Sequence, residues 1–524
     1  MSMSSFPDLL QFTSRAAPLE MTEEQFRALG HELVDRIAGF LASLRGRAVT
    51  PRESADKVRT ILDAARALPE EGEEVGKLLR GAADLLFEHS LHNGHPRFYG
   101  YITSSAAPIG MLAELLAAAV NANVGAWKLA PMATEIEGQV IRWLAQFIGY
   151  PMDCGGLLLS GGNMANVTCF LAARAAKAGW DVRKQGVAGG PPLRAYASKE
   201  THTWIQKAAD VAGLGTDAIR WIGVDQQQRM DLAALEVQYK RDVAEGYRPF
   251  LVAGTAGTVS TGAVDPLADL AAFCQERKLW FHVDGAYGAF AAGVKSAPAD
   301  LMGLAAADSV AVDPHKWLYA PLEAGCALVR DPAALRNAFS YHPSYYNFEV
   351  EGTNYYDLGP QNSRGFRALK IWLALQQAGA AAYREMIRKD IALARRLYEL
   401  ATEHVELEAF THNLSITTLR YVPLELGAGV GSETTEAYLN RLNQLLLTLL
   451  ENSGEAFCSN ALIEGKYALR FCIVNFRTSD EDIEAIPQLV ARLGRKAHAE
   501  LSSQVGRVAI GSKHVHDGEP TASY

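Results

Sequence analysis

Hydrophobic residues recur along the chain with two different periods, which separate expected helices from expected strands. Residues 22–41 (TEEQFRALGHELVDRIAGFL) place apolar side chains three and four positions apart, which predicts an amphipathic helix. The pair Thr22 and Gln25 has the spacing of a capping box at the helix start. The apolar face of this helix is expected to pack either on the chain's own core or on a second subunit.

From about residue 85 onward, short apolar runs alternate with longer helical patterns. The strands expected from these runs are 156–160, 194–198, 249–257, 279–284 and 309–313. Strands that alternate with helices build parallel sheets with helices on both faces. The pattern therefore predicts an α/β fold with a mostly parallel sheet.

A chain of 524 residues exceeds what one hydrophobic core usually supports, so we expect more than one domain. Two later runs, 416–422 and 467–476, predict strands of a smaller unit. The expected organisation is an N-terminal helical segment (1–85), a large domain (86–380), a small C-terminal α/β domain (381–500) and a flexible tail (501–524). The tail is expected because its sequence is polar and without a period.

The composition, 49% hydrophobic and 21% charged, is that of a soluble globular protein. A net charge of -9 gives no broad electrostatic reason to bind nucleic acid or an anionic membrane, so small molecules are the expected partners. The richest apolar stretch, 111–120, contains Glu114 and is too short to span a bilayer. Neither a membrane segment nor a secretory signal is expected at the N-terminus.

Six cysteines are scattered without a C-x-x-C pair, which fits neither a disulfide framework nor a zinc cluster. We expect buried thiols, no metal site and a cytoplasmic location.

The strongest chemical signal is Asp313-Pro314-His315-Lys316-Trp317, directly after an apolar strand. A lysine in a cleft at a strand end can be desolvated and made nucleophilic. Upstream, the run 279–284 ends in Asp284, a carboxylate that needs a positive or hydrogen-bonding partner at the edge of a buried strand. The protonated pyridine nitrogen of pyridoxal 5'-phosphate is such a partner.

A turn of small residues, Ser160-Gly161-Gly162-Asn163, follows strand 156–160 and precedes a helical run. Helix N-termini present free N–H groups to anions, so this turn is a candidate cradle for the phosphate of the cofactor. Such a turn alone is common in α/β proteins. The combination becomes specific because Asp284 and Lys316 follow the turn in this order along the chain.

Together these motifs resemble the group II pyridoxal-phosphate decarboxylases, relatives of the aromatic-L-amino-acid, histidine and glutamate decarboxylases. The resemblance runs from about residue 20 to about residue 495. It rests on His95-Pro96-Arg97-Phe98, Pro131 to Glu135, Ser160 to Asn163, His202, Thr255 to Thr258, His282 to Tyr287, Asp313 to Trp317 and Ser363-Arg364. It implies fold type I of the pyridoxal-phosphate enzymes, with a seven-stranded sheet in the large domain.

The resemblance also implies roles. Lys316 forms a Schiff base with the cofactor, Asp284 pairs with the pyridine nitrogen, and His202 stacks on the ring. The remaining cofactor contacts that it implies are Gly162, Asn163, Thr255, Ala286 and His315. The acid that protonates the α-carbon lies on a long loop, and the residue in this position is Tyr345, with Tyr341, Tyr346, Tyr355 and Tyr356 nearby in the sequence.

The chain departs from the family pattern at Asp313 and Gly365, and Asn93 stands where aromatic decarboxylases place a ring-stacking tryptophan. Asp313 stands where several relatives carry Asn, and a carboxylate there would repel the phosphate unless it turned toward backbone N–H groups. Gly365 stands where the family often has a second arginine, so only Arg364 can brace the site.

The expected reaction is decarboxylation of an L-amino acid, with an aromatic substrate preferred and Tyr101 and Ile102 as its neighbours. A substrate that is acidic or a diamino acid is the alternative, because Arg97 is suited to pair with a carboxylate or to form a structural salt bridge. An aminotransferase of the same fold is a further alternative, with Arg470 as its carboxylate clamp. A homodimer is expected because the N-terminal helix and the small domain leave apolar faces to cover.

Overall fold

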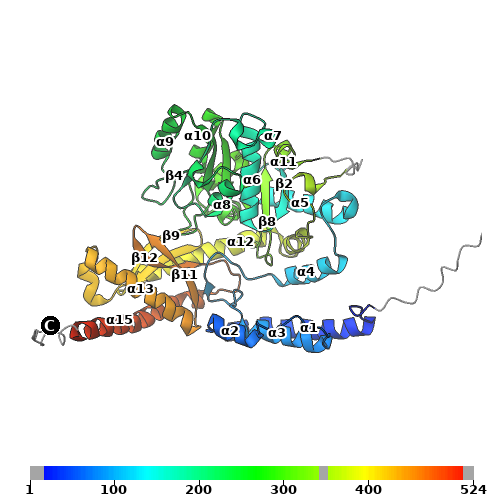
Figure 1. The fold of residues 1–524 in the computed structure, drawn as a ribbon. Helices are drawn as coiled ribbons and strands as arrows, with labels where there is room; N and C mark the ends of the chain where they lie inside the picture. The colour runs from blue at the N-terminus through cyan, green and yellow to red at the C-terminus, as the bar shows by residue number, and fades with distance from the viewer. Residues whose placement is uncertain (1–16, 342–351, 512–524) are drawn as a thin grey trace, which may run out of the picture. The chain divides into compact units, whose positions relative to one another are not determined.

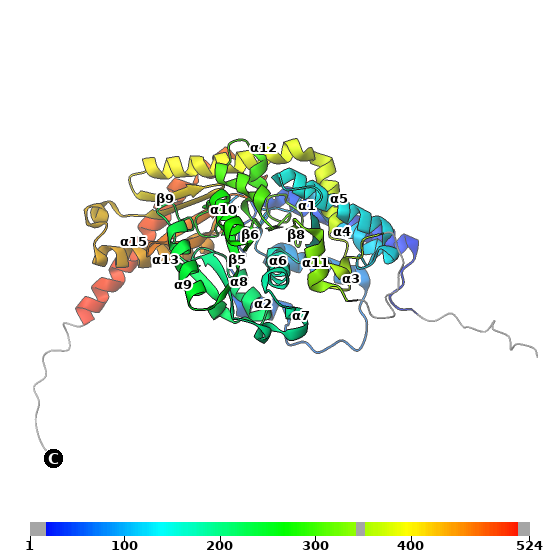
Figure 2. The ribbon, with the colours of Figure 1, turned by 90° about the horizontal axis from the view of Figure 1, so that it is seen from above.

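The computed structural model describes residues 17–341 and 352–511, without the side chains of 504–511. The described chain forms two compact units (Figures 1 and 2). One unit comprises the residues up to Arg47 together with Pro51–Leu91, and the other comprises Ala48–Thr50 and the chain from His92 onward.

The first unit is helical. Its helices are α1 (Glu23–Ser43), α2 (Ala55–Leu62) and α3 (Val75–His89). The capping box predicted at Thr22 and Gln25 is confirmed. No residue of α1 is buried, and Phe26 is 64% exposed. Phe40 of α1 stacks on Phe87 of α3 with 4.4 Å between ring centroids, so part of the apolar face packs within this unit.

The second unit contains a seven-stranded sheet in the order β2-β8-β7-β6-β5-β3-β4. The strands are β2 (Gly155–Leu159), β3 (Leu193–Ser198), β4 (Ile219–Ile222), β5 (Arg248–Thr255), β6 (Trp280–Asp284), β7 (Ser309–Val312) and β8 (Gly325–Val329). All five strands expected in this region are present. Neighbours from β4 to β7 are parallel, and β8 runs antiparallel to both β7 and β2. The expected mostly parallel sheet is confirmed.

Helices surround this sheet. They are α4 (Pro108–Val120), α5 (Pro131–Ile148), α6 (Gly162–Lys177), α7 (Val182–Gln185), α8 (Trp204–Val211), α9 (Leu232–Ala244), α10 (Leu267–Arg277) and α11 (Pro332–Phe339). In Figure 2 the sheet lies between α10 on one side and α6 with α8 on the other. Helix α6 packs against at least five of the seven strands, so it covers much of one face of the sheet.

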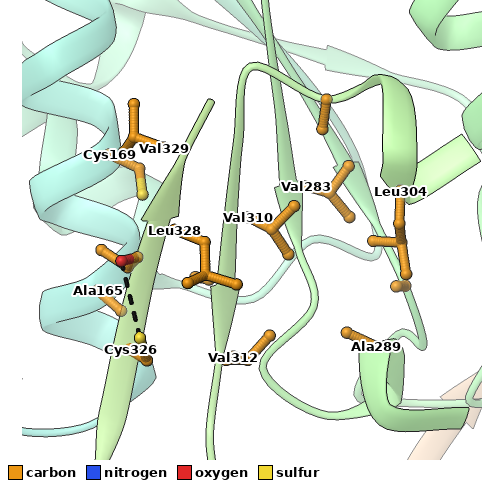
Figure 3. Packing of buried hydrophobic residues seen from close by; sticks show 14 of the residues in the cluster. Ala165, Cys169, Val283, Ala289, Leu304, Val310, Val312, Cys326, Leu328 and Val329 are labelled. Atoms are coloured by element: carbon orange, nitrogen blue, oxygen red, sulfur yellow. Dashed lines mark hydrogen bonds between the residues drawn. The ribbon is translucent and has the colours of Figure 1, made fainter. Parts of the chain in front are cut away.

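The core of the large sheet is aliphatic. Figure 3 shows Val283 of β6 and Val310 and Val312 of β7 beside Leu328 of β8, and all four are fully buried. β-Branched and leucine side chains on strands that are covered on both faces produce the continuous apolar runs seen in the sequence.

A second sheet has the strand order β1-β11-β12-β10-β9. Its strands are β1 (Phe98–Tyr99), β9 (Leu407–Asn413), β10 (Ile416–Tyr421), β11 (Phe457–Ile463) and β12 (Lys466–Cys472), and its helices are α13 (Glu433–Ser453), α14 (Asp480–Glu484) and α15 (Ile486–Gly511). Two of these strands, β10 and β12, match the runs expected from the sequence. The early strand β1 pairs with β11, so a segment that precedes the large sheet completes the small one.

Helix α12 (Ala368–Glu403) packs against α4 and α5 and also against β9 and β10. It contains one non-helical residue, Gly379, with φ of 73°. The domain boundary expected between residues 380 and 381 falls inside this helix. A glycine tolerates positive φ without the steric cost that other residues have, so the helix bends there.

Helix α15 differs from the expectation, because it continues to Gly511 into the predicted tail. Val490, Leu493, Ala497 and Leu501 are buried at helical spacing, and this apolar stripe carries the helix past residue 500. All six cysteines are free thiols, five of them buried, as the sequence predicts. Within the described ranges, no helix is long and apolar enough to cross a membrane.

Candidate active site

Three neighbouring parallel strands end at one edge of the large sheet. Thr255 at the end of β5 lies directly opposite Asp284 at the end of β6, and the segment that follows β7 carries Lys316. In open α/β sheets, ligands bind beyond the carboxyl ends of the strands. The fold therefore brings residues from three separate motifs to one place.

The side chains of β6 that precede this edge show which face of the sheet is used. His282, two residues before Asp284, contacts Asn166 of α6 through its Nε2 atom at 2.7 Å. Residues two apart on a strand share a face. Asp284 therefore lies on the face that α6 covers, the same face over which α6 begins.

Lys316 lies in a short turn after β7. Its Nζ atom is 3.0 Å from Oδ2 of Asp313, and its backbone N–H donates to the carbonyl of Asp313 at 2.9 Å. The Nδ1 atom of His315 lies 2.7 Å from the carbonyl oxygen of Ala324. The side chain of Lys316 is one-fifth exposed, so its amine remains accessible from the edge of the sheet.

Asp284 is buried, with 6% of its surface exposed. Its Oδ1 atom accepts a hydrogen bond from the backbone N–H of Ala286 at 3.1 Å. This bond turns the carboxylate back toward the end of its own strand. A buried carboxylate is stable only with strong donors around it, which leaves Asp284 suited to a cationic ligand group.

His202 lies beside the same cluster. The charges of Asp284, Lys316 and Asp313 all act on its imidazole, while burial lowers its pKa below the ordinary value. Its Nδ1 atom accepts a hydrogen bond from the backbone N–H of Trp204 at 3.1 Å, which fixes the ring at the start of α8. Burial therefore favours the neutral form of this ring.

The small-residue turn forms the N-terminus of α6. Gly161 has φ of 86°, a conformation that favours glycine. A Cβ atom at Gly162 would lie 2.5 Å from Oδ2 of Asp313, so no larger residue fits there. The turn, Asp313 and Lys316 therefore form one continuous surface.

Three polar atoms at this edge are buried without a hydrogen-bond partner among the described residues: Oγ1 of Thr255, Oδ1 of Asn163 and Oδ1 of Asp313. Buried polar atoms are normally satisfied, and exceptions often mark a ligand site. These unpaired atoms therefore indicate a ligand site at this edge.

Other residues support the site from behind, and the sequence assigned no role to them. Asp265 accepts hydrogen bonds from the backbone N–H groups of Thr255 and Met230 at 2.8 and 2.7 Å, and burial raises its pKa to about 6. His282 also contacts Ser309 Oγ at 2.8 Å, and burial lowers the pKa of this histidine to about 4. Their signal was weak, because a lone aspartate after a strand or a histidine within one is common.

Arg364 is buried among the elements that lead to the phosphate turn. Its guanidinium donates to the carbonyls of Val124 and Leu158 at 2.8 and 2.7 Å and pairs with Glu137. Glu137 in turn accepts from the backbone N–H of Leu158 on β2. This network fits the bracing role expected for Arg364.

The two residues expected near the substrate lie on a segment that reaches the lysine turn. The hydroxyl of Ser104 donates to the carbonyl of His315 at 2.8 Å, and Tyr101 is 62% exposed. Ile102 packs against the core of the large sheet.

Arg470 of β12 lies next to this segment. It is 2% exposed and donates through Nη1 to the carbonyl of Tyr101 at 2.9 Å. Its Nε and Nη2 groups lack a partner within the described part of the chain. By contrast, Arg97 is held by Asp482, with its Nε atom 3.1 Å from Oδ1, so it forms a salt bridge within the protein.

The candidate acid Tyr345 lies outside the described residues, as does Tyr346. Tyr341, just before this gap, lies under the guanidinium of Arg183 at 4.2 Å from the ring centroid. Tyr355 and Tyr356, just after it, are buried.

Comparison with known proteins identifies the relatives of this arrangement. Residues 58–419 match the pyridoxal-dependent decarboxylase conserved domain. An aromatic-L-amino-acid decarboxylase from Bacillus atrophaeus is 33% identical, over 91% of this chain and 97% of the relative. Tyrosine decarboxylase 3 from Petroselinum crispum is 30% identical over 91% and 93%, and a phenylacetaldehyde synthase from a Rosa hybrid cultivar is 28% identical over 91% and 96%.

Solved structures agree with these sequence relatives. The structure of Oryza sativa TDC with PLP and tryptamine superposes with a TM-score of 0.84 and 26% identity, covering 92% of this chain and 99% of that one. Mouse CSAD superposes with a TM-score of 0.83 and 26% identity, covering 89% and 99%. The similarity therefore extends through both sheets.

Proposed function

Because the chain belongs to the family of pyridoxal-dependent decarboxylases, we propose that it converts an aromatic L-amino acid into the corresponding amine and carbon dioxide, with pyridoxal 5'-phosphate bound at Lys316. The observation that carries this proposal is the meeting of Lys316, Asp284 and the N-terminus of α6 at one sheet edge. Thr255 Oγ1 and Asn163 Oδ1 are buried there without partners among the residues that the structure describes.

The residues present fit the cofactor. Lys316 would bind its aldehyde carbon, Asp284 its pyridine nitrogen, and Gly162 and Asn163 its phosphate. When bound, the cofactor supplies an electron sink for the charge left on the α-carbon after carbon dioxide departs. Thr255, Ala286 and His315 complete the set of proposed contacts.

The chain's own residues would then have distinct tasks. Asp284 keeps the pyridine nitrogen protonated, because an opposite charge stabilises the cationic form. His202 is suited to lie against a ring, since burial favours the neutral form of its imidazole and Trp204 fixes it. Tyr345 would donate the proton that the α-carbon needs.

An aromatic substrate is supported by the relatives, several of which are named for aromatic amino acids. Arg97 also supports an aromatic substrate. Its guanidinium pairs with Asp482 inside the protein, so this arginine is engaged there and not by the carboxylate of an acidic substrate. Tyr101 and Ile102 are the proposed side-chain contacts. The Nε and Nη2 groups of Arg470, which have no partner in the described part of the chain, would be available to a polar group of the substrate.

A second candidate function is oxidative decarboxylation to an aldehyde. It is favoured by one observation, the 28% identity to a phenylacetaldehyde synthase over 91% of this chain. The sequence argues against it, because relatives with this activity are expected to lack the loop tyrosine that is present here as Tyr345.

The deciding experiment is a panel of the twenty amino acids with DOPA, 5-hydroxytryptophan and 2,4-diaminobutyrate, assayed for carbon dioxide, amine, aldehyde and peroxide. We expect amine and carbon dioxide in equal amounts from an aromatic member. Release from glutamate or diaminobutyrate alone would contradict the proposed substrate. Aldehyde with peroxide would support the second candidate, and keto-acid-dependent turnover without carbon dioxide would indicate transamination.

We also propose that the enzyme is a cytoplasmic homodimer. The free thiols fit a reducing compartment. On α4, Leu112, Leu115, Leu116 and Val120 are each more than half exposed. A continuous apolar helix face of this kind is suited to a second copy of the chain.

A further inference from the structure

A carboxylate lies against the turn assigned above to the phosphate of the cofactor. Asp313 is 2% exposed, and both its carboxylate oxygens would lie within 3 Å of a Cβ atom placed on Gly162. Gly162 is the first residue of α6, so this carboxylate occupies the space beside the helix N-terminus. The turn proposed to hold the phosphate is thus lined by a carboxylate of the protein itself.

The two oxygens of this carboxylate have different surroundings. Oδ2 pairs with Lys316 at 3.0 Å and lies 3.7 Å from Nε2 of His315. Oδ1 is buried and has no partner within the described ranges. An unpaired acceptor needs a donor, and a phosphate dianion offers none. Like charges in a poorly hydrated site also repel each other.

The backbone gives the carboxylate little room to turn away. It is enclosed by Gly162 on one side and by the lysine turn on the other, and Lys316 N–H is bonded to the Asp313 carbonyl. An asparagine of the same shape would present an N–H donor in place of one oxygen. Aspartate and asparagine have nearly the same size. The charge of the Asp313 side chain is therefore what would make this site less favourable for a phosphate than a site with asparagine at the same position.

The pair with Lys316 acts in the same direction. A neighbouring carboxylate stabilises the ammonium form of a lysine, whereas attack on an aldehyde requires the neutral amine. The contact between Asp313 and Lys316 therefore opposes attack of the lysine on the cofactor.

We propose that Asp313 limits the affinity of the site for pyridoxal 5'-phosphate, so that the cofactor exchanges more readily than it would from a site with an amide here. This inference rests on the function proposed above. It concerns how tightly the phosphate group of the cofactor is bound, and it predicts nothing about the rate of the chemical step.

The test compares dissociation constants measured on protein stripped of cofactor and titrated with pyridoxal 5'-phosphate, followed by fluorescence quenching and by the absorbance of the Lys316 adduct. Asp313→Asn should bind the cofactor at least about tenfold more tightly than the parent, because one like-charge repulsion is replaced by a hydrogen bond. An unchanged or raised dissociation constant would overturn the proposal.

Two controls isolate the phosphate. Asp313→Asn should raise the affinity for pyridoxal, which lacks the phosphate, much less than the affinity for pyridoxal 5'-phosphate. An equal gain in affinity for both ligands would show that Asp313 acts through Lys316 alone, and it would refute the proposal. Asp308→Asn makes the same charge change just before β7, five residues and about 16 Å of strand away, and should leave affinity nearly unchanged. If the parent forms no Lys316-dependent adduct at all, the proposed function fails instead.

Discussion

The carboxylate of Asp390 accepts a hydrogen bond of 2.9 Å from the indole nitrogen of Trp317, the residue that follows Lys316. It also accepts one of 2.7 Å from the hydroxyl of Tyr319. Asp390 belongs to α12, the helix that packs against α4 and α5 and against β9 and β10 of the small sheet. One buried acid on this helix therefore holds the side chains of two aromatic residues, Trp317 and Tyr319, that follow Lys316 in the chain.

Burial raises the pKa of Asp390 to about 7, which makes stability depend on pH. In the unfolded chain this carboxyl ionises near pH ~3.9. Its contribution is therefore fully present below that pH and is lost as pH rises toward 7. Asp390→Asn should gain stability relative to the parent between pH 5 and pH 8, measured by thermal unfolding at both. An equal offset in melting temperature at the two pH values would contradict this.

Thr255→Val should separate binding from stability. The Thr255 hydroxyl is buried without a partner in the described structure, so its loss should leave the melting temperature of cofactor-free protein unchanged or raised. Cofactor affinity should fall about tenfold, the worth of one hydrogen bond. The matched control is Thr258→Val, because Thr258 Oγ1 lies 3.0 Å from Thr261 Oγ1 and accepts from Ala263 N–H. That variant should lose about 1–2 kcal/mol of unfolding free energy and little affinity.

Lys316→Ala should abolish the cofactor adduct and lower kcat/KM by at least about a hundredfold, because both the covalent link and a proton carrier are removed. Absorbance and carbon dioxide release measure the two effects. Lys207→Ala, a change to a second lysine whose charge also acts on His202, is the control and should retain the adduct. Retention of parental turnover in Lys316→Ala would place the cofactor elsewhere.

Tyr345→Phe should change the product. Removing the acid while keeping the ring prolongs the carbanionic state, which can react with dioxygen. Less amine and more aldehyde, ammonia and peroxide are expected, quantified by chromatography and a peroxidase assay. Tyr346→Phe and Tyr341→Phe should behave like the parent. For Tyr341 this agrees with its position under Arg183. A product switch in Tyr346→Phe would reassign the acid.

Leu116→Lys should weaken self-association, because it places a charge in the exposed apolar face of α4. Sedimentation velocity at micromolar and nanomolar concentrations measures the effect. Val237→Lys on α9, also exposed at 69%, is the control and should leave the sedimentation coefficient unchanged. A parent that is active as a monomer would exclude the dimer.

The sequence was most informative where burial is continuous. Strands such as β6 and β7 were predicted because both faces are covered and nearly every residue is apolar. Strand β8 was missed, since its sequence GCALV is short and contains a glycine. The sequence predicts a tail from residue 501 because polar residues follow Leu501, whereas α15 continues to Gly511.

The candidate site was predictable only for residues adjacent in sequence to a recognisable motif. Asp284 and Lys316 each follow an apolar run, so their positions at strand ends could be inferred. Asp265, Asp390 and Ser104 act through contacts with distant segments, and no local pattern marks them. Nor did the sequence indicate which oxygen of Asp313 would be left without a partner.

The pairing of Thr255 with Asp284 restricts where the chain can change length. Side chains alternate between the two faces of a sheet, so a one-residue deletion within β6 would carry Asp284 to the face opposite α6. Insertions in the connections before β5 and β6 leave that alternation intact. In this part of the chain, active relatives and engineered variants should therefore differ in the length of the connections before β5 and β6, while the number of residues in the two strands stays the same.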